Sequence, residues 1–264
     1  MTLEEIWLPL YVKGYPFQYE GELKSLHEGK KLVGRAVTCT FMPTRPDLFS
    51  VVKEVGNRHG WSGTCNQWVI DNLTEGDVVV ADMYDKVYNG TFVGGNLTTA
   101  INVRTKTGGA VIWGGIRDIE QMRKIDTQVY YRGIHPTPIR ECVMTGYNMA
   151  CRIGGAVCLP GDVVMGTSSG VLFIPSFCVA EVINSAEKTH AKDIFGFAML
   201  EEGVYTTAEI DNSVWSIEMM ERLQKFIQKD PRCEKYRELD WSLEIAAAHG
   251  EEEALKEVLK TCLV

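Results

Sequence analysis

Two opposite charges stand side by side directly after an apolar stretch, in "IWGGIRDIE" (112–120). If a buried strand delivers Arg117 and Asp118 to a crevice at its carboxyl edge, the usual ligand position in α/β sheets, both could act on one small molecule. An arginine can donate hydrogen bonds to a carboxylate or carbonyl oxygen, and an aspartate can coordinate a hard divalent cation such as Mg²⁺. The plainer interpretation is a strand end with two solvated charges, where Asp118 caps a helix that begins near Ile119. Because adjacent side chains of a strand point to opposite sides, we do not expect the pair to be simply an internal salt bridge.

A glycine-led helix start in "VGGNLTTA" offers a second set of groups. Gly94 and Gly95 precede a helix whose first free amides would be those of Asn96, Leu97 and Thr98. Backbone N–H groups at a helix N-terminus bind carboxylate or phosphate, and the helix dipole favours the negative charge. The alternative is an ordinary glycine-rich turn with Asn96 as the N-cap.

Two other candidate features carry less chemistry. "GTSSG" matches the G-x-S-x-G nucleophile elbow at Ser168, which requires a strand, a sharp turn and then a helix. The strand-like "VLFIP" follows it instead, so we predict a hairpin turn and no nucleophile. The five histidines lack the spacing of a zinc site, and only His135, in "YYRGIHPTP", stands beside other candidate site residues.

The chain is acidic, with a formal net charge of −8 over 264 residues. A nucleic-acid-binding protein would carry a basic face, so we expect no nucleic-acid partner. The first residues do not have the pattern of a signal peptide, and no stretch approaches the ~18 apolar residues of a membrane helix. Eight cysteines show no C-x-x-C spacing, and Cys39, Cys158 and Cys178 lie in or beside apolar runs. We therefore expect a cytoplasmic protein with reduced cysteines and no membrane partner.

Strand-like and helix-like segments alternate in the first half of the chain. "LVGRAVTCTFMP", "EGDVVVADM" and "AVIWGGI" predict strands, whereas "DLFSVVKEVGNRHG" and "NLTTAINVRTKTGG" have helical spacing. This alternation predicts an α/β core. "TQVYYRG", "GGAVCLPGDVVMG" and "SGVLFIP" then predict short strands separated by turns.

The last part of the chain has a helical pattern. Residues 178 to 203 predict one helix that ends at Gly203, and "SVWSIEMMERLQKFIQKD" predicts another with one apolar stripe. We therefore divide the chain into a lead-in (1–30), a core (31–203) and a helical extension (204–264).

Several of these pieces occur in the order found in one known family. Its members carry a glycine-led helix start, then an acidic residue, twenty residues and Arg-Asp; this chain reads "GGN", twenty residues and Arg117-Asp118. "YYRGIHPTP" is similar to the family's aromatic-x-Arg-Gly-x-x-Pro segment, and "LPGDVVMGTSSGVLFIP" to its Pro-Gly-Asp, strand, Gly-Val, strand, Pro ending. Residues 31 to 203 thus resemble the family that contains the regulator of ribonuclease E activity A (RraA) and the class II 4-hydroxy-4-methyl-2-oxoglutarate/4-carboxy-4-hydroxy-2-oxoadipate aldolases.

The resemblance implies an α/β fold with an RraA-like β/β/α core, to which this chain adds its C-terminal helical extension. It also implies homotrimers or homohexamers with active sites at subunit interfaces. The carboxylate of a pyruvate-like unit would lie on the backbone at Gly95, Asn96, Leu97 and Thr98, and His135 would also contact the substrate.

The family resemblance assigns the two charges of the opening motif as the catalytic pair. Arg117 would bind the keto and carboxylate oxygens and steady the enolate. Asp118 would hold Mg²⁺ or Mn²⁺, together with a carboxylate from the C-terminal helix of a neighbouring subunit, for which Asp193 is the first candidate and Glu187 the second. Metal and arginine together would stabilise the negative charge that develops when a bond next to the carbonyl breaks.

The chain departs from the family pattern at several places. Asn96 replaces the acidic residue, so it cannot act as a base or add charge to the metal shell. The acidic run that often precedes Gly-Val is Thr167-Ser168-Ser169 here, and "HGWSGTCNQW" (59–68) reads as an insertion that could build a different substrate pocket with Trp61 and Trp68.

The expected function is a metal-dependent lyase that acts on a small 2-keto acid, by retro-aldol cleavage or by oxaloacetate-type decarboxylation. Two alternatives stay open. One is β-elimination or dehydration of a sugar-derived keto compound in the same site, and the other is a non-catalytic regulator that docks on a partner enzyme.

Overall fold

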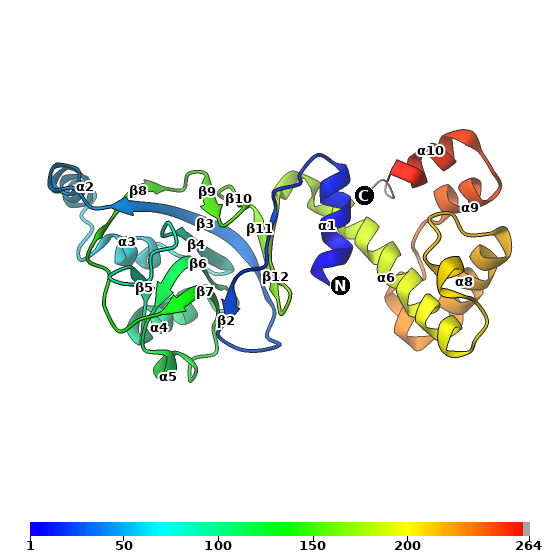
Figure 1. Ribbon diagram of the computed structural model, residues 1–264, viewed down its shortest axis with the longest axis horizontal. Helices are drawn as coiled ribbons and strands as arrows, with labels where there is room; N and C mark the ends of the chain where they lie inside the picture. The colour runs from blue at the N-terminus through cyan, green and yellow to red at the C-terminus, as the bar shows by residue number, and fades with distance from the viewer. Residues whose placement is uncertain (261–264) are drawn as a thin grey trace. The chain divides into compact units, whose positions relative to one another are not determined.

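A computed structural model describes residues 1–260, and the chain forms two compact units (Figure 1). The first unit, which we call the sheet unit, comprises Pro16–Val179. The second, the helical unit, combines Met1–Tyr15 with the chain from Ala180 onward. Cys262 and the other residues of 261–264 lie outside the described residues.

The sheet unit contains one ten-stranded mixed sheet, in which the strand order is β1-β12-β11-β3-β4-β6-β7-β2. The short strand β5 also pairs with β6, and β8 also pairs with β3. The central neighbours β3, β4, β6 and β7 run parallel, and the outer pairs are antiparallel. The strands of this sheet are β1 (Tyr19–Glu20), β2 (Lys24–Ser25), β3 (Leu32–Pro43), β4 (Asp77–Asp82), β5 (Thr91–Val93), β6 (Gly109–Ile116), β7 (Gln128–Ile134), β8 (Cys142–Tyr147), β11 (Val163–Thr167) and β12 (Gly170–Ile174).

The buried strands divide their side chains between two cores, because successive residues of a strand face opposite sides of the sheet. On β4, Val79 and Ala81 join one core, and Val78 and Val80 join the other. Residues of α3 (Cys65–Asp71), α4 (Gly95–Thr105) and α5 (Ile119–Met122) complete the first core. The hairpin of β9 (Cys151–Ile153) and β10 (Ala156–Cys158) completes the second. The layers are therefore helix, sheet and hairpin, which confirms the expected mixed α/β core (Figure 1).

Helix α2 (Pro46–Arg58) differs from the other helices of the sheet unit. Among its residues only Gly56 is buried, and the apolar side chains of Phe49, Val51 and Val55 are exposed. The helical spacing of this segment predicted its secondary structure correctly, but α2 does not bury an apolar face within the described chain.

The predicted hairpin at Ser168 is confirmed. Strands β11 and β12 are antiparallel, and Thr167 lies opposite Gly170, so Ser168 and Ser169 form the turn between them. No helix follows the serine, and the nucleophile-elbow geometry is therefore absent at this position.

The helical unit is formed around α6, which follows a short 3₁₀ turn, η1 (Ser176–Cys178). Its helices are α1 (Leu3–Val12), α6 (Val179–Glu201), α7 (Thr207–Ile210), α8 (Ile217–Lys229), the 3₁₀ segment η2 (Pro231–Tyr236), α9 (Ser242–Ala248) and α10 (Glu252–Lys260). Gly203, with φ of 66°, follows the end of α6 as predicted. Met219, Met220 and Leu223 of the predicted α8 stripe are buried in the same core cluster as Phe195 and Met199 of α6. The additional C-terminal helices are thus present.

The seven cysteines within the described residues are free, and all but Cys65 are buried. Burial raises the pKa of the Cys158 thiol well above its ordinary value, so this group behaves as a small apolar side chain. Among residues 1–260, no helix is both long enough and apolar enough to cross a membrane.

Candidate active site

Strand β6 brings Arg117 and Asp118 to the edge of the sheet. All eight residues of the strand are buried, and the Arg117 amide then donates to the carbonyl oxygen of Val93 at 3.0 Å. Asp118 has φ of 56° and ψ of 37°, which is the left-handed region that few residues other than glycine, asparagine and aspartate adopt. Asp118 precedes α5, but its side chain makes no capping hydrogen bond to that helix. Its carboxylate is therefore available for another role.

The side chains of Arg117 and Asp118 converge. Arg117 Nε lies 3.5 Å from Asp118 Oδ2, and the side chains are 26% and 40% exposed. The expectation that the pair would not form a direct salt bridge is wrong, because it assumed extended backbone at both positions. The left-handed backbone at Asp118 turns its side chain back toward Arg117 instead.

The turn at Gly94 and Gly95 lies against this pair. Gly94 is the N-cap of α4, and the Gly95 amide donates to Asp118 Oδ2 at 3.3 Å. A Cβ atom on Gly94 would collide with the Asp118 carboxylate and would crowd Arg117. The two glycines therefore allow the backbone to approach the charged pair closely.

The N-terminus of α4 begins one residue earlier than the anion-site prediction assumed. The Thr98 amide is already within the helix, where it donates to the Gly94 carbonyl oxygen at 3.0 Å. The prediction that Thr98 offers a free amide is therefore wrong. The amides of Asn96 and Leu97 occupy the first turn and have no acceptor among residues 1–260. These two groups are the donors that remain for a ligand.

His135 lies beside Asp118, as its position in the sequence suggested. Its backbone amide donates to the Ile116 carbonyl oxygen at 3.0 Å, and its Nδ1 lies 3.0 Å from Thr137 Oγ1. A depression of about 310 Å³ has both Asp118 and His135 in its wall. The other residues that line it are Ile119, Glu120, Gln121, Ile134 and Pro136. We call the group formed by Arg117, Asp118, the α4 amides and this depression the Arg117–Asp118 site.

Thr91 was not expected to take part. It is a buried polar residue on β5, and its hydroxyl accepts a hydrogen bond from Arg117 Nη1 at 3.4 Å. The same hydroxyl donates to the carbonyl oxygen of Thr137 in the segment after His135. Thr91 therefore orients the guanidinium. A threonine in an otherwise apolar strand three residues before the glycine pair was the available sequence signal.

Asp193, the first candidate for a metal ligand from a neighbouring subunit, lies on α6 in the helical unit. Burial raises the pKa of its carboxyl group, and the nearby Glu5 raises it further. Glu187 is on the same helix. Their roles at a neighbouring subunit's site stay predictions.

A divalent cation at the Arg117–Asp118 site would depend on few protein ligands. No group of three histidine, cysteine, aspartate or glutamate side chains within residues 1–260 is arranged to hold a metal. Asp118 Oδ1 has no hydrogen bond to the described residues, and Glu120 and Gln121 supply further oxygen atoms in the same depression. Mg²⁺ commonly binds through one or two carboxylates and keeps several waters. The donor set fits such a cation and does not fit an ion that requires a cage of protein ligands.

A family model described as RraA-like, Aldolase/RraA, matches residues 13–173 of this chain. The chain belongs to the RraA-like family. Among curated proteins, it is 28% identical over 164 residues to Protein DlpA of Legionella pneumophila. It is also 26% identical over 118 residues to a protein of Halalkalibacterium halodurans named "Putative 4-hydroxy-4-methyl-2-oxoglutarate aldolase". These matches cover 61% and 45% of this chain, but only 24% of DlpA and 55% of the Halalkalibacterium protein.

A solved structure supports the RraA-like fold. Streptomyces coelicolor RraAS2, described as an unusual member of the RNase ES inhibitor RraA protein family, superposes with a TM-score of 0.63 at 24% sequence identity. The superposition covers 74% of this chain and 91% of RraAS2. The RraA-like family includes both metal-dependent aldolases and non-catalytic regulators, so family membership alone does not distinguish these two functions.

Proposed function

We propose that this protein is a divalent-metal-dependent carbon–carbon lyase that acts on a 2-keto acid through a pyruvate-like enolate. The observation that carries the proposal is the convergence of Arg117 and Asp118 beside two free helix amides. This arrangement offers donors for a carboxylate, a cation for a developing oxyanion and a carboxylate for a metal ion. The likeness to a relative named as an aldolase supports the same reaction class.

In this proposal the protein binds the 2-keto acid by its two polar ends. The amides of Asn96 and Leu97 receive the carboxylate, and the Arg117 guanidinium donates to the keto oxygen. Thr91 and Asp118 hold the guanidinium in place through the 3.4 Å hydrogen bond and the 3.5 Å ion pair. His135 lines the same depression and would contact the remainder of the substrate.

The proposed chemical step breaks the bond between C3 and C4 of the keto acid. The electron pair of that bond moves to form the C2–C3 double bond, and the keto oxygen becomes an oxyanion that Arg117 stabilises. Carbon dioxide leaves in a decarboxylation, and a carbonyl compound leaves in a retro-aldol cleavage, in which a base also removes the hydroxyl proton. Proton uptake at C3 then yields pyruvate. A bound Mg²⁺ or Mn²⁺, held by Asp118 and water, would add positive charge beside the same oxygen.

The test is pyruvate release from oxaloacetate, measured with and without EDTA and corrected for a blank that lacks the protein. We expect the wild type to require Mg²⁺ or Mn²⁺, and Arg117→Ala and Asp118→Ala to lose about 100-fold or more of the activity. Arg45→Ala and Asp47→Ala are matched controls, because these residues form an exposed ion pair outside the site. Equal rates in the wild type and in both site variants would rule out the lyase.

The identity of Asn96 is the reason to propose an alternative reaction for the same site. The residue cannot supply the negative charge that the aldolases of the family place at this position, so β-elimination or dehydration of a sugar-derived keto compound is the alternative use of the enolate. A screen of keto acids and keto sugars separates the two reactions. A metal-independent protein that turns over neither class would instead be a regulator that docks on a partner enzyme.

We also propose that the protein forms a homotrimer or homohexamer with active sites at its interfaces. RraA-like proteins are commonly oligomeric. In the sheet unit, Phe17, Val157 and Leu159 are exposed, and the Val157 amide donates to the Phe17 carbonyl oxygen, so these residues belong to neighbouring segments of the surface. Such a surface supports self-association. Light scattering of the purified chain measures the state directly.

A further inference from the structure

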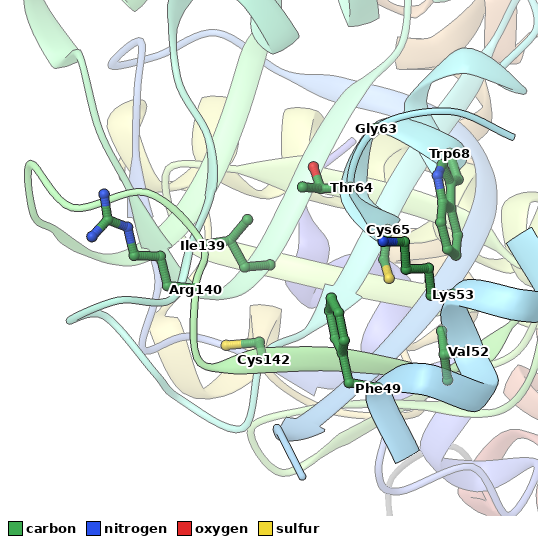
Figure 2. Close-up of a pocket in the computed structure, with 10 residues that line it drawn as sticks. All are labelled: Phe49, Val52, Lys53, Gly63, Thr64, Cys65, Trp68, Ile139, Arg140 and Cys142. Atoms are coloured by element: carbon green, nitrogen blue, oxygen red, sulfur yellow. The ribbon is translucent and has the colours of Figure 1, made fainter. Parts of the chain in front are cut away.

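A second cavity of the sheet unit lies between α2, α3 and the segment that leads into β8 (Figure 2). Its volume is about 280 Å³. We call it the Lys53 pocket. The residues that line it are Phe49, Val52, Lys53, Gly63, Thr64, Cys65, Trp68, Ile139, Arg140 and Cys142. None of the residues assigned to the Arg117–Asp118 site is among them.

The wall of the Lys53 pocket is mainly apolar and partly rigid. Trp68 is only 6% exposed, and the aromatic ring of Trp61 packs against it with ring centroids 5.7 Å apart. Helix α3 is joined to β5, because Asn66 Nδ2 donates to the Phe92 carbonyl oxygen at 2.6 Å. The 59–68 segment, which we predicted to be an insertion, thus contributes Trp68 to the wall of the pocket, and Trp61 packs against Trp68. The indole N–H of Trp68 is buried and has no acceptor among the described residues.

Two cations, Lys53 and Arg140, line the Lys53 pocket, and both are exposed residues. In the view of Figure 2 the Lys53 side chain extends from α2 toward the other lining residues, whereas the guanidinium of Arg140 points away from them. Within residues 1–260, neither cation has an ion-pair partner.

The acidic residues nearest in sequence already have other partners. Asp47 pairs with Arg45, and Glu54 pairs with Arg58. Glu141, next to Arg140, pairs with Lys86 at 2.9 Å. Lys53 therefore has no carboxylate partner among residues 1–260 and lines a mainly apolar cavity, and an anion with an apolar body would complement both properties.

We infer that the Lys53 pocket binds a small monocarboxylate with a compact aromatic or branched apolar group. The apolar group lies against Phe49, Trp68 and Ile139, and the carboxylate pairs with the Lys53 amino group. The volume of about 280 Å³ accommodates a group of this size and excludes larger cofactors. The binding site is separate from the Arg117–Asp118 site and does not depend on the proposed lyase activity.

The test compares 3-phenylpropionate with its neutral analogue 3-phenylpropanol by calorimetry on the full chain. We expect the acid to bind about tenfold more tightly than the alcohol, which corresponds to about 1.4 kcal/mol. Lys53→Gln should reduce this ratio to near one, and Lys53→Arg should restore most of it. Acetate, which lacks the apolar group, should show no measurable binding at the same concentrations.

Three variants act as controls for charge and location. Arg140→Gln and Lys24→Gln remove one positive charge each, the first at the rim of the Lys53 pocket and the second on β2, and should change the acid-to-alcohol ratio by less than about twofold. Arg117→Ala should bind 3-phenylpropionate as the wild type does. Loss of binding in Arg117→Ala, or an unchanged ratio in Lys53→Gln, would overturn the inference. Failure of the lyase assay would leave these binding results unaffected.

Discussion

The Arg117–Asp118 site and the Lys53 pocket belong to the same unit but are built in different ways. At the first, the backbone sets the geometry: a left-handed aspartate, two adjacent glycines and the first turn of α4 bring charges and amides together. At the second, side chains from α2, α3 and the segment that leads into β8 line a mainly apolar space, and Lys53 is one of them. Where the backbone sets the geometry of a site, one added carbon atom can displace its charged groups. Where side chains line a pocket, a substitution mainly changes which ligands the pocket accepts.

The largest expected effect separates charge from shape at the first site. Asp118→Asn preserves the size of the side chain and an oxygen that can accept from the Gly95 amide, but it removes the negative charge. We expect the rate of pyruvate release to fall about 100-fold or more at any Mg²⁺ concentration tested. A fall of less than about threefold would mean that the carboxylate acts only through its shape.

Gly94→Ala should reduce activity about tenfold without unfolding the protein. Alanine can adopt the backbone conformation of Gly94, at φ of −141°, and the new methyl group would meet Asp118 Oδ2 and the Cγ and Nε atoms of Arg117. We expect the pair to separate and the melting temperature to change by less than about 2 °C. Gly155→Ala is the matched control, because a Cβ atom there meets no other atom. Full activity in Gly94→Ala would show that the close approach of the turn is not required.

Asn96→Asp should sharpen the role of the α4 N-terminus in metal binding. An added carboxylate near Asp118 would raise the affinity for Mg²⁺, and we expect the concentration for half-maximal activity to decrease about fivefold. The measurement is a Mg²⁺ titration of pyruvate release. No change, with unaltered maximal activity, would place residue 96 outside the metal shell.

Val52→Phe tests the independence of the two regions. The larger side chain should fill part of the Lys53 pocket and abolish binding of 3-phenylpropionate, while pyruvate release changes by less than about twofold. A parallel loss of both properties would show that the two regions share one ligand, and the comparison would fail.

The smallest expected effect is a change in the pH dependence of the free energy of unfolding, caused by the carboxyl group of Asp162. Burial raises the pKa of the Asp162 carboxyl group in the folded sheet, although the Leu159 amide donates to it at 2.8 Å. Because the folded state holds the proton more tightly, the free energy of unfolding is highest below the unfolded pKa and decreases as pH rises through the folded pKa. Asp162→Asn should remove this decrease and add about 1 kcal/mol or less at pH 7. Urea denaturation at pH 4 and pH 7 measures the difference, and an equal effect at both pH values would contradict the assignment.

Much of the fold could be predicted because local patterns and tertiary structure agree. The apolar run that became β6, the glycine-terminated pattern of α4 and the stripe of α8 each specify one structure. The strands β8 and β9 were not predicted, since their pairing depends on distant neighbours and their own pattern is short.

The residues of the candidate site could be predicted from the sequence, but their geometry could not. Residue types identified Arg117 and Asp118, but their relative direction depends on φ at Asp118, which the sequence does not reveal. The predicted start of α4 was one residue too late, because glycine can serve as an N-cap without a side chain that marks the position. This error assigned a free amide to Thr98. The exposed face of α2 also could not be anticipated, because helical spacing gives the face of a helix but not what covers it.

The helical unit contains both the first fifteen residues and the chain from Ala180 onward, so its folding has an unusual order during synthesis. Helix α1, with the apolar residues Leu3, Ile6 and Leu10, is synthesised before the sheet unit, whereas the helix that carries His190, the partner of Glu5, is synthesised after it. The apolar side chains of α1 therefore lack their partners on α6 while the sheet unit is being synthesised, and we expect this segment to be a preferred contact for chaperones during that interval.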